Sequence, residues 1–574
     1  MSGEAVRERS SERRIAPLYR GVTLVVAGTC FVIAAVVGTT VGFHDWDSMV
    51  FSEWSRLIFE HPGFHYPALG AQDYQRPGYY VLQGYVWVVL NGWWGWGRLL
   101  SLGFTSLLVV VVTLLAVGDG RRRNEEGSRD WATWSLAILL TLSVTDVPRW
   151  ALSSLTDIPV AALVGSTAVL AFAARRSPWW VVLTAASAAA AMLTKPSALP
   201  GVVAVMLGCL IGSRDDLAAR IRFGLGPVAA GLSAGIAYGL YESHRLHLNL
   251  WDFWRAGISG RFEASARVVR MDALVSTEFV GPYVRVVAVF GLFYALFRCL
   301  QIAHRRAAGG SVVVAAVIAL VGPRLSDHLD PVGVMSSAEV AVVSLVLLLT
   351  VGATVFADEG LAPSRPFLGR LLVLAVVPLT VWLWKAGYET RLSSAAWPGV
   401  LALAAATLAP GVRQLARSFG AASLVPLLAL VLAVWGGLTH LDGFDSGRWR
   451  TYRSLGATGI WRSQSTDQLF SGALMDTVKQ VQGVVGEDGR ILTTEARIGF
   501  FTPGRVTEAN PRRCSDLVPY RAFVLRTDQG NVDEMERAAP GTSSASFWAA
   551  CRAPALRELS DGSNGYAIFE VIRA

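Results

Sequence analysis

The stretch GVTLVVAGTCFVIAAVVGTTVG at residues 21–42 contains no charged side chain, and HDWDS follows it at residues 44–48. A helix that crosses a bilayer needs roughly 20 mostly apolar residues. The first stretch meets that requirement, and the second places two carboxylates where the helix leaves the hydrocarbon. Together they predict a membrane helix with an acidic group at one of its ends.

Apolar runs of the same kind recur along most of the chain, so the sequence predicts a polytopic α-helical membrane protein with about thirteen transmembrane helices. The stretch 178–212 reads either as two short helices or as one long broken helix. The candidate spans are 21–42, 98–117, 131–146, 158–174, 178–194, 197–212, 224–241, 284–302, 311–323, 338–356, 371–384, 395–410 and 421–440.

The overall composition supports this class and excludes others. Of 574 residues, 53% are hydrophobic and 16% are charged, and the mean hydropathy is +0.43. These values exclude a soluble cytosolic protein and a disordered chain. Five cysteines cannot form a disulfide framework in a chain of this length. Residues 441–574 hold 16 basic and 16 acidic side chains, so the net charge of +8 lies in the membrane part. That distribution favours orientation in a bilayer over nucleic-acid binding.

The charges of the short loops predict the orientation. The N-terminal residues 1–20 are basic, and every second loop after them carries arginines, such as Arg121–Arg123. Basic loops are cytoplasmic by the positive-inside rule. An odd number of spans then places residues 441–574 outside the plasma membrane. No cleavage site precedes the first span, so we expect an uncleaved first helix. The loops predicted to lie outside are about 43–97, 147–157, 195–196, 242–283, 324–337 and 385–394.

The first outer loop, at residues 43–97, is long and rich in polar and aromatic side chains. Long loops without a disordered composition are usually functional. Asp45 and Asp47 stand at the membrane boundary, where partial desolvation raises the basicity of a carboxylate. Such a group can act as a general base or ligate a divalent cation such as Mg²⁺ or Mn²⁺. The alternative is that the two acids only cap the next helix.

Two further polar groups lie at predicted outer ends of spans. Asp157 enters its span beside Pro159, where the helix dipole favours an acid and ordinary capping is the alternative role. Lys195 is one of three lysines in the chain, against 48 arginines. A lysine retained in such a composition indicates a role for a point charge, such as phosphate binding. Snorkelling to the interface is the alternative.

The outer loop 385–394 gathers Lys385, Tyr388, Glu389 and Arg391 within seven residues. Arginine can hold a phosphate through two parallel hydrogen bonds. Predicted outer loops are otherwise poor in clustered cations, so this cluster favours a function. The alternative is a set of solvated loop charges.

The order of these motifs resembles that of the GT-C superfamily of polyprenyl-phosphate-dependent glycosyltransferases. The likeness is greatest to the branch that contains protein O-mannosyltransferases and lipid A aminoarabinose transferases, and it covers about residues 21–440. The motifs that carry it are HDWDS at 44–48, YQRPGYYVLQ at 74–83, Thr156-Asp157-Ile158-Pro159, Leu193-Thr194-Lys195 and RLSSAAWP at 391–398.

The resemblance implies an enzyme that transfers a hexose or pentose from polyprenyl phosphate to an extracytoplasmic glycan, lipid or protein. The family's first-loop acid falls on Asp47, with Asp45 as the second choice. The family's Lys and late Arg, which lie near the lipid phosphate, fall on Lys195 and Arg391. Arg76 stands where the family often has His or Lys, which makes it a further phosphate contact. The remaining candidates for the site are Asp157, Tyr79, Tyr388 and Lys385.

This sequence departs from the family in its acidic motif. The family's usual form is Asp-Glu, whereas this chain has Asp45-Trp46-Asp47. The departure leaves open which carboxylate is catalytic. It also keeps open a scaffold of cell-envelope assembly that binds polysaccharide without turnover. A transporter or flippase is a further alternative class. A transporter is expected to show inverted repeats and mid-membrane charges, and the sequence shows neither clearly.

Residues 441–574 predict a small extracytoplasmic α/β domain. GRILTTEARIGFF, AFVLRTDQ and YAIFEVI read as strands, and segments near 465–482 and 531–538 read as helices. Cys514 and Cys551 are the only cysteines of this region, and an oxidising compartment would allow them to form a disulfide. The chain has no nucleotide-binding glycine loop, zinc spacing or Ser-His-Asp motif, so a cytosolic nucleotide-sugar donor is not supported.

Overall fold

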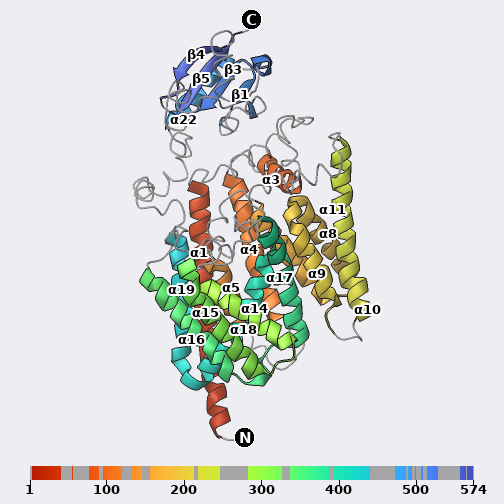
Figure 1. The fold of residues 1–574 in the computed structure, drawn as a ribbon, viewed down its shortest axis with the longest axis vertical. Helices are drawn as coiled ribbons and strands as arrows, with labels where there is room; N and C mark the ends of the chain where they lie inside the picture. The colour runs from red at the N-terminus through yellow and green to blue at the C-terminus, as the bar shows by residue number, and fades with distance from the viewer. Residues whose placement is uncertain are drawn as a thin grey trace. The chain divides into compact units, whose positions relative to one another are not determined.

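The computed structural model describes much of the helical region and part of the C-terminal region (Figure 1). It divides into two compact units. Unit 1 comprises residues 1–37, 75–78 and 99–445, and unit 2 comprises 38–74, 79–98 and 446–574. The described residues are 3–40, 55, 77–89, 95–118, 131–144, 156–212, 217–245, 282–325, 337–386, 394–439, 472–486, 489–493, 498, 506–508, 514–527, 556–563 and 565–572.

Each of the predicted spans overlaps a helix of the structure. The helices of this region are α1 (Gly3–Thr40), α4 (Gly95–Val117), α5 (Trp131–Ser143), α7 (Asp157–Ala173), α8 (Pro178–Thr194), α9 (Leu199–Leu210), α10 (Leu217–Arg220), α11 (Gly226–Arg245), α14 (Pro282–Cys299), α15 (His304–Leu325), α16 (Ser337–Phe356), α17 (Arg365–Ala386), α18 (Trp397–Phe419) and α19 (Leu424–Thr439). Short turns are η3 (Pro196–Ala198), the π-helical η4 (Ile221–Leu225), η5 (Glu359–Leu361) and η7 (Gly420–Ser423).

Two details of this region refine the sequence predictions. The stretch 178–212 forms two helices, α8 and α9, because Pro196 cannot continue α8. The first outer loop also contains a helix, α3 (Pro77–Val89), that the hydropathy pattern did not indicate. Its 13 residues are fewer than a membrane crossing needs.

Four helices among the described residues are long and apolar enough to cross a membrane: Arg14–Val36, Leu99–Val117, Arg365–Trp382 and Ser394–Phe419. Seven further apolar helices have 10–17 residues. The helical positions therefore agree with the prediction, and the number of spans stays a prediction.

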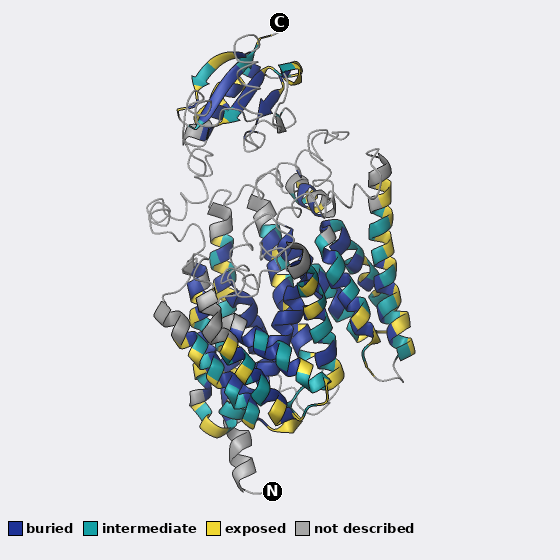
Figure 2. Ribbon diagram, viewed as in Figure 1, coloured by how far each residue is buried: buried dark blue, intermediate teal, exposed yellow. Residues whose placement is uncertain are grey.

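The core of unit 1 is built around α18. Its residues from Trp397 to Val412 are all buried, and it packs against α5, α7, α14, α16 and α17. Figure 2 shows the buried residues gathered in the interior of the helical bundle. Hydroxyl side chains in the helices bond back to carbonyl oxygens one turn earlier, as Thr407 does to Leu403 (2.8 Å) and Thr113 to Val109 (2.7 Å). This pattern satisfies polar groups in apolar surroundings.

Glycines let helix backbones approach each other closely in this bundle. A Cβ on Gly399 of α18 would lie 2.5 Å from the backbone nitrogen of Ala375 and 2.6 Å from the carbonyl carbon of Leu374. Both atoms belong to the backbone of α17, so neither can move aside without shifting that helix. Small residues at such crossings are typical of membrane helices.

Replacing Gly399 with Ala is therefore expected to destabilise unit 1 by about 1–3 kcal/mol, the usual cost of overpacking. Thermal unfolding of the full-length protein in detergent measures this effect. The matched control is Gly352→Ala in α16, where a Cβ would meet nothing within 4 Å. Equal melting temperatures for the two variants would show that the α17–α18 crossing is not tight.

The C-terminal region contains a five-stranded sheet with the order β2-β1-β3-β5-β4. β1 pairs in parallel with β2 and with β3, whereas β5 pairs antiparallel with β3 and β4. The elements are α22 (Gly472–Val485), β1 (Ile491–Thr493), β2 (Val506–Glu508), η8 (Cys514–Leu517), β3 (Ala522–Arg526), β4 (Leu556–Asp561) and β5 (Tyr566–Val571).

Alternate residues of these strands face opposite sides of the sheet. On one face, Ala522, Val524 and Ile568 join Val478 and Val481 of α22 in one apolar cluster. The other face gathers a second cluster of buried residues, which are Leu492, Leu517, Phe523, Leu556, Ala567 and Phe569. The three predicted strands are β1, β3 and β5, and α22 overlaps the first predicted helix. The second predicted helix, near 531–538, lies outside the described residues.

Cys514 in η8 is disulfide-bonded, and Cys30, Cys209 and Cys299 are free. The expected partner of Cys514, Cys551, lies outside the described residues. The pairing of these two cysteines stays a prediction.

Candidate functional site

The described part of unit 1 contains a buried ion pair between two of the residues singled out in the sequence. Lys195 Nζ lies 2.6 Å from Asp157 Oδ1 and donates a hydrogen bond to it. The side chains are 9% and 2% exposed, respectively. The sequence analysis treated these residues as separate candidates, and the fold brings them together across 38 positions of the chain.

Lys195 is positioned by the turn between α8 and α9. It caps the C-terminus of α8 in an extended conformation (φ −163°, ψ 133°), and its backbone N–H donates to the carbonyl of Ala191. Its own carbonyl accepts a hydrogen bond of 2.9 Å from the N–H of Ala198 in η3. Pro196 enforces the break, since a residue before proline is disfavoured in the helical region. The turn therefore holds the lysine backbone on both sides.

Asp157 is the first residue of α7, so the helix dipole stabilises its carboxylate. Thr156 precedes it as N-cap and forms no side-chain capping hydrogen bond. The ion pair therefore links the α8–α9 turn to the N-terminus of α7. Such a link is a structural role in its own right.

The segment that follows the predicted Arg391 loop packs near the same helices. Ala395 precedes α18, and its Cβ lies 3.3 Å from the position that a Cβ on Gly201 of α9 would take. Pro398, in the first turn of α18, lies 3.2 Å from the corresponding position on Gly165 of α7. The starts of α9 and α18 therefore both contact α7, although Arg391 itself lies outside the described residues.

Three hydroxyl groups close in sequence to these contacts are buried without a hydrogen-bond partner in the described structure. They are Thr156 Oγ1, Ser197 Oγ and Ser394 Oγ. Buried hydroxyl groups in proteins are nearly always hydrogen-bonded. They lie beside Asp157, two residues after Lys195 and at the start of the α18 segment, although buried polar atoms without a partner also occur elsewhere in the described structure.

The Lys195–Asp157 pair could contribute to an anion site only together with further cations. Asp157 accepts a hydrogen bond from the ammonium group of Lys195. The ion pair is neutral as a whole. A phosphate at this place is favoured by the ammonium and by the dipoles of helices that begin nearby. Cations from other segments must supply the net charge.

Of the other predicted site residues, Tyr79 and Lys385 lie within the described ranges, and the rest lie outside them. Tyr79 is described in α3, within unit 2, and is 1% exposed. Burial raises the pKa of its hydroxyl group above the usual value. Nearby in the same helix, Gln83 accepts a hydrogen bond of 3.1 Å from Ser55 of the first loop. Lys385 lies in the last turn of α17, and its side chain is not among those described. The predicted residues outside the described ranges are Asp45, Asp47, Arg76, Tyr388 and Arg391.

The described residues contain no group of three or more His, Cys, Asp or Glu side chains that could hold a metal ion. The predicted metal ligand, Asp47, lies outside those residues.

The sequence did not predict the Lys195–Asp157 contact or the buried hydroxyl groups. The signal that could have found the pair is the placement of both residues at predicted outer ends of spans, where an acid and a base of opposite charge can meet.

No protein-family model matches this chain, and no curated protein matches it significantly. Among solved structures, the chain is similar to ArnT from Cupriavidus metallidurans bound to undecaprenyl phosphate, with 14% identity, a TM-score of 0.47, and 97% of this chain and 98% of that chain covered. The apo structure of the same protein has 14% identity and a TM-score of 0.47, with 96% of this chain and 98% of that chain covered. A third similar structure is the archaeal oligosaccharyltransferase AglB from Archaeoglobus fulgidus in complex with an inhibitory peptide and a dolichol-phosphate. It has 10% identity and a TM-score of 0.43, with 91% of this chain and 71% of that chain covered.

Both proteins are GT-C glycosyltransferases, the superfamily that the motifs of this chain resemble. At these identities and TM-scores the likeness carries no argument about what this chain binds or transfers.

Proposed function

We propose that this protein is a membrane glycosyltransferase that moves a sugar from a polyprenyl-phosphate donor to an extracytoplasmic acceptor, which is a glycan, a lipid or a protein. The observation that supports the proposal most is the buried contact between Lys195 and Asp157. These residues come from two of the motifs that resemble the GT-C pattern. The turn that carries Lys195 and the start of α18 both pack against α7.

In this proposal each candidate has a defined role. Lys195, Arg391 and Arg76 bind the lipid phosphate, and Asp157 holds the ammonium of Lys195 in place. Asp47 or Asp45 is the general base. The polar side chains of Tyr79, Lys385 and Tyr388 complete the list of candidates for the donor and acceptor sites.

The reaction follows from these roles. The acceptor hydroxyl oxygen forms a bond to the anomeric carbon of the sugar, while the bond from that carbon to the phosphate oxygen breaks. The carboxylate takes the proton of the hydroxyl group. The departing polyprenyl phosphate carries the developing negative charge, and the cations stabilise it.

A divalent cation would be held by Asp47, since carboxylate oxygens suit Mg²⁺ and Mn²⁺. A bound cation would supply further positive charge for the phosphate.

The proposal places the site at the outer boundary of the plasma membrane. The polyprenyl tail lies in the bilayer and its headgroup at the interface, which is where the predicted outer ends of α7 and α8 meet. The N-terminus is then cytoplasmic and residues 441–574 are extracytoplasmic, as the arginine pattern of the loops predicts.

Sugar transfer by the full-length protein, reconstituted in vesicles with lipid-linked sugars that differ in the sugar, tests the proposal. We expect loss of sugar from one donor and its appearance on an envelope glycan, lipid or protein added outside. Movement of the intact donor between leaflets without transfer would instead indicate a flippase. Donor binding without turnover, for every acceptor fraction of the envelope, would indicate a scaffold.

A further inference from the structure

The turn between α7 and α8 carries two arginines and a tryptophan on the surface of unit 1. Arg175, Arg176 and Trp179 are all exposed. Trp179 is 77% exposed, the highest value among the large hydrophobic residues that the structure describes. An indole side chain combines a large apolar ring with a polar N–H, so it suits a boundary between water and an apolar phase.

The backbone of this turn is held against α7. Ala174 ends the helix in the left-handed conformation (φ 43°, ψ 44°), and its N–H donates to the carbonyl of Ala171. The indole Nε1 of Trp180 donates a hydrogen bond of 2.8 Å to the carbonyl of Leu170. The guanidinium carbon of Arg175 lies 4.5 Å from the centre of the Trp180 ring. The second tryptophan therefore fixes the turn, whereas its neighbour Trp179 is left exposed.

The charges of the two arginines are available to a ligand. In the described part of the chain, neither guanidinium group has a hydrogen-bond or ion-pair partner. The contact of Arg175 with Trp180 is a cation–π contact, which leaves the positive charge in place. The turn therefore presents two adjacent positive charges beside an exposed aromatic ring.

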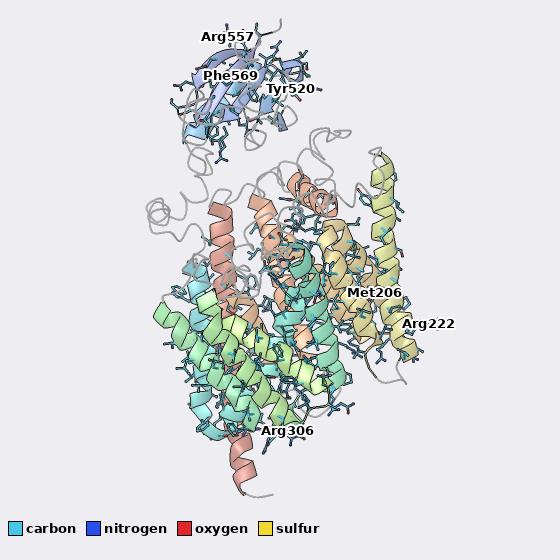
Figure 3. All side chains as sticks on the ribbon, in the orientation of Figure 1. Met206, Arg222, Arg306, Tyr520, Arg557 and Phe569 are labelled. Carbon is cyan, nitrogen blue, oxygen red and sulfur yellow. The ribbon has the colours of Figure 1, made fainter. Side chains whose placement is uncertain are left out.

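A third exposed arginine lies at the same end of α7. A Cβ on Gly224 in η4 would lie 2.6 Å from the carbonyl oxygen of Ala171, so η4 packs against the last turn of α7. Arg222 of η4 is exposed, and Figure 3 shows it toward the end of unit 1 at which the chain begins. The α7–α8 turn lies between two predicted outer loops, so the positive-inside rule predicts that it faces the cytoplasm.

This combination fits the headgroup region of an anionic membrane. The negative surface potential of the cytoplasmic leaflet attracts basic side chains near the bilayer. The planar fork of a guanidinium group matches two oxygens of a phosphate. Tryptophan rings sit at the level of the headgroups. A phosphate ion free in water would use the arginines but would give the exposed indole no role.

We propose that the α7–α8 turn is an interfacial anchor, in which Arg175 and Arg176 bind the phosphate of an anionic phospholipid and the Trp179 indole inserts at the level of the headgroups. Both helices lead from this turn to the Lys195–Asp157 pair at their other ends. The anchor therefore fixes how deep the α7–α8 hairpin lies in the bilayer. The inference does not depend on the proposed sugar transfer.

Photolabelling of the full-length protein in nanodiscs tests the anchor. The probes are phosphatidylglycerol and phosphatidylcholine, each with a photoactivatable group close to the phosphate, and mass spectrometry locates the labelled peptides. We expect phosphatidylglycerol to label residues 174–179 in preference to phosphatidylcholine. Arg175→Gln combined with Arg176→Gln should reduce this labelling by about 10–30-fold, since each arginine near an anionic surface contributes a factor of about five.

The matched control is the double variant Arg305→Gln with Arg306→Gln. These two arginines are also adjacent and exposed, at the start of α15, and their replacement should leave the labelling of residues 174–179 unchanged. Arg175→Lys with Arg176→Lys keeps both charges and should retain most of the labelling. All four arginines are exposed, so these variants are expected to fold.

The aromatic part of the anchor has its own test. Trp179→Gln removes the ring and should weaken the labelling of the turn, whereas Trp179→Tyr supplies another interfacial residue and should retain it. Wild-type labelling in Trp179→Gln would show that the indole takes no part in the anchor.

Three results would overturn the proposal as a whole. They are equal labelling of residues 174–179 by the two probes, wild-type labelling in the double Gln variant of the turn, and loss of labelling when inorganic phosphate is added at constant ionic strength. The last result would indicate a site for free phosphate in place of a lipid.

Discussion

Replacing the proposed catalytic carboxylate of the first outer loop is expected to slow the proposed sugar transfer by about 10²–10⁴-fold, the usual contribution of a general base. Asp47→Asn should show this loss, with Asp45→Asn as the second choice. An amide has nearly the shape of the carboxylate but cannot accept the proton of the acceptor hydroxyl. The measurement is the initial rate of transfer from a lipid-linked donor in membranes that hold equal amounts of each variant.

The matched control for this experiment is Asp476→Asn. Asp476 is exposed on α22 of the C-terminal region and is far from the first loop in sequence. The Asp476→Asn variant should therefore transfer sugar at the wild-type rate. A donor-binding measurement separates the two roles of the acid, because a base is needed for transfer and not for binding. Full activity in both loop variants would exclude Asp45 and Asp47 as the general base.

Removing the carboxylate of the buried ion pair is expected to destabilise unit 1 strongly. Asp157→Asn leaves the ammonium of Lys195 in a site where its side chain is 9% exposed. Breaking a buried ion pair on one side costs about 3–5 kcal/mol, because the remaining charge loses its oppositely charged partner in a desolvated site. Denaturant or thermal unfolding of the full-length protein in detergent measures the loss.

The exposed ion pair between Arg417 and Asp358 is the matched control. Its atoms lie 2.9 Å apart, but the side chain of Asp358 is 68% exposed. Exposed pairs contribute about 0–1 kcal/mol, so Asp358→Asn should have little effect. Equal destabilisation by Asp157→Asn and Asp358→Asn would show that burial of the Lys195 pair has no energetic consequence.

A double variant distinguishes a structural role of this pair from a functional one. Asp157→Asn with Lys195→Met removes both charges, and buried pairs replaced by apolar groups often regain stability. We therefore expect folding to recover while transfer from the lipid-linked donor stays lost, because the phosphate contact is gone. Recovery of transfer in the double variant would mean that the pair only holds α8 and α9 against α7.

Much of the fold was predictable because membrane helices obey one strong constraint. Backbone polar groups in a bilayer must be satisfied within the segment, so long apolar runs become helices. The run at 98–117 and the run at 178–194 agree with α4 and α8 almost residue for residue. Helix α3 was not predicted because its 13 residues are too few for the length criterion and include three tyrosines and a glutamine.

The strands of the C-terminal region show the same dependence on burial. β3 and β5 lie inside the sheet and read as strands because their residues are mostly apolar. β4 has the sequence LRELSD and pairs only with β5, so it is an edge strand with polar residues. Hydropathy is weakest for such strands, and the sequence analysis did not predict it.

The sequence analysis did not predict the pairing of Lys195 with Asp157, for a different reason. Periodicity reports which face of a helix is buried, and it carries no information about which distant residue that face contacts. The motif order indicated that both residues matter. Only the packing of the α8–α9 turn against the start of α7 shows that they touch.

The central claim is that three segments distant in sequence meet around one lipid phosphate. A photoactivatable polyprenyl phosphate with its reactive group next to the phosphate, applied to the full-length protein in membranes, tests this most directly. We predict labelled peptides from residues 43–97, from the turn around Lys195 and from residues 385–394. Labelling confined to one of these segments, or found only elsewhere in the chain, would contradict the account.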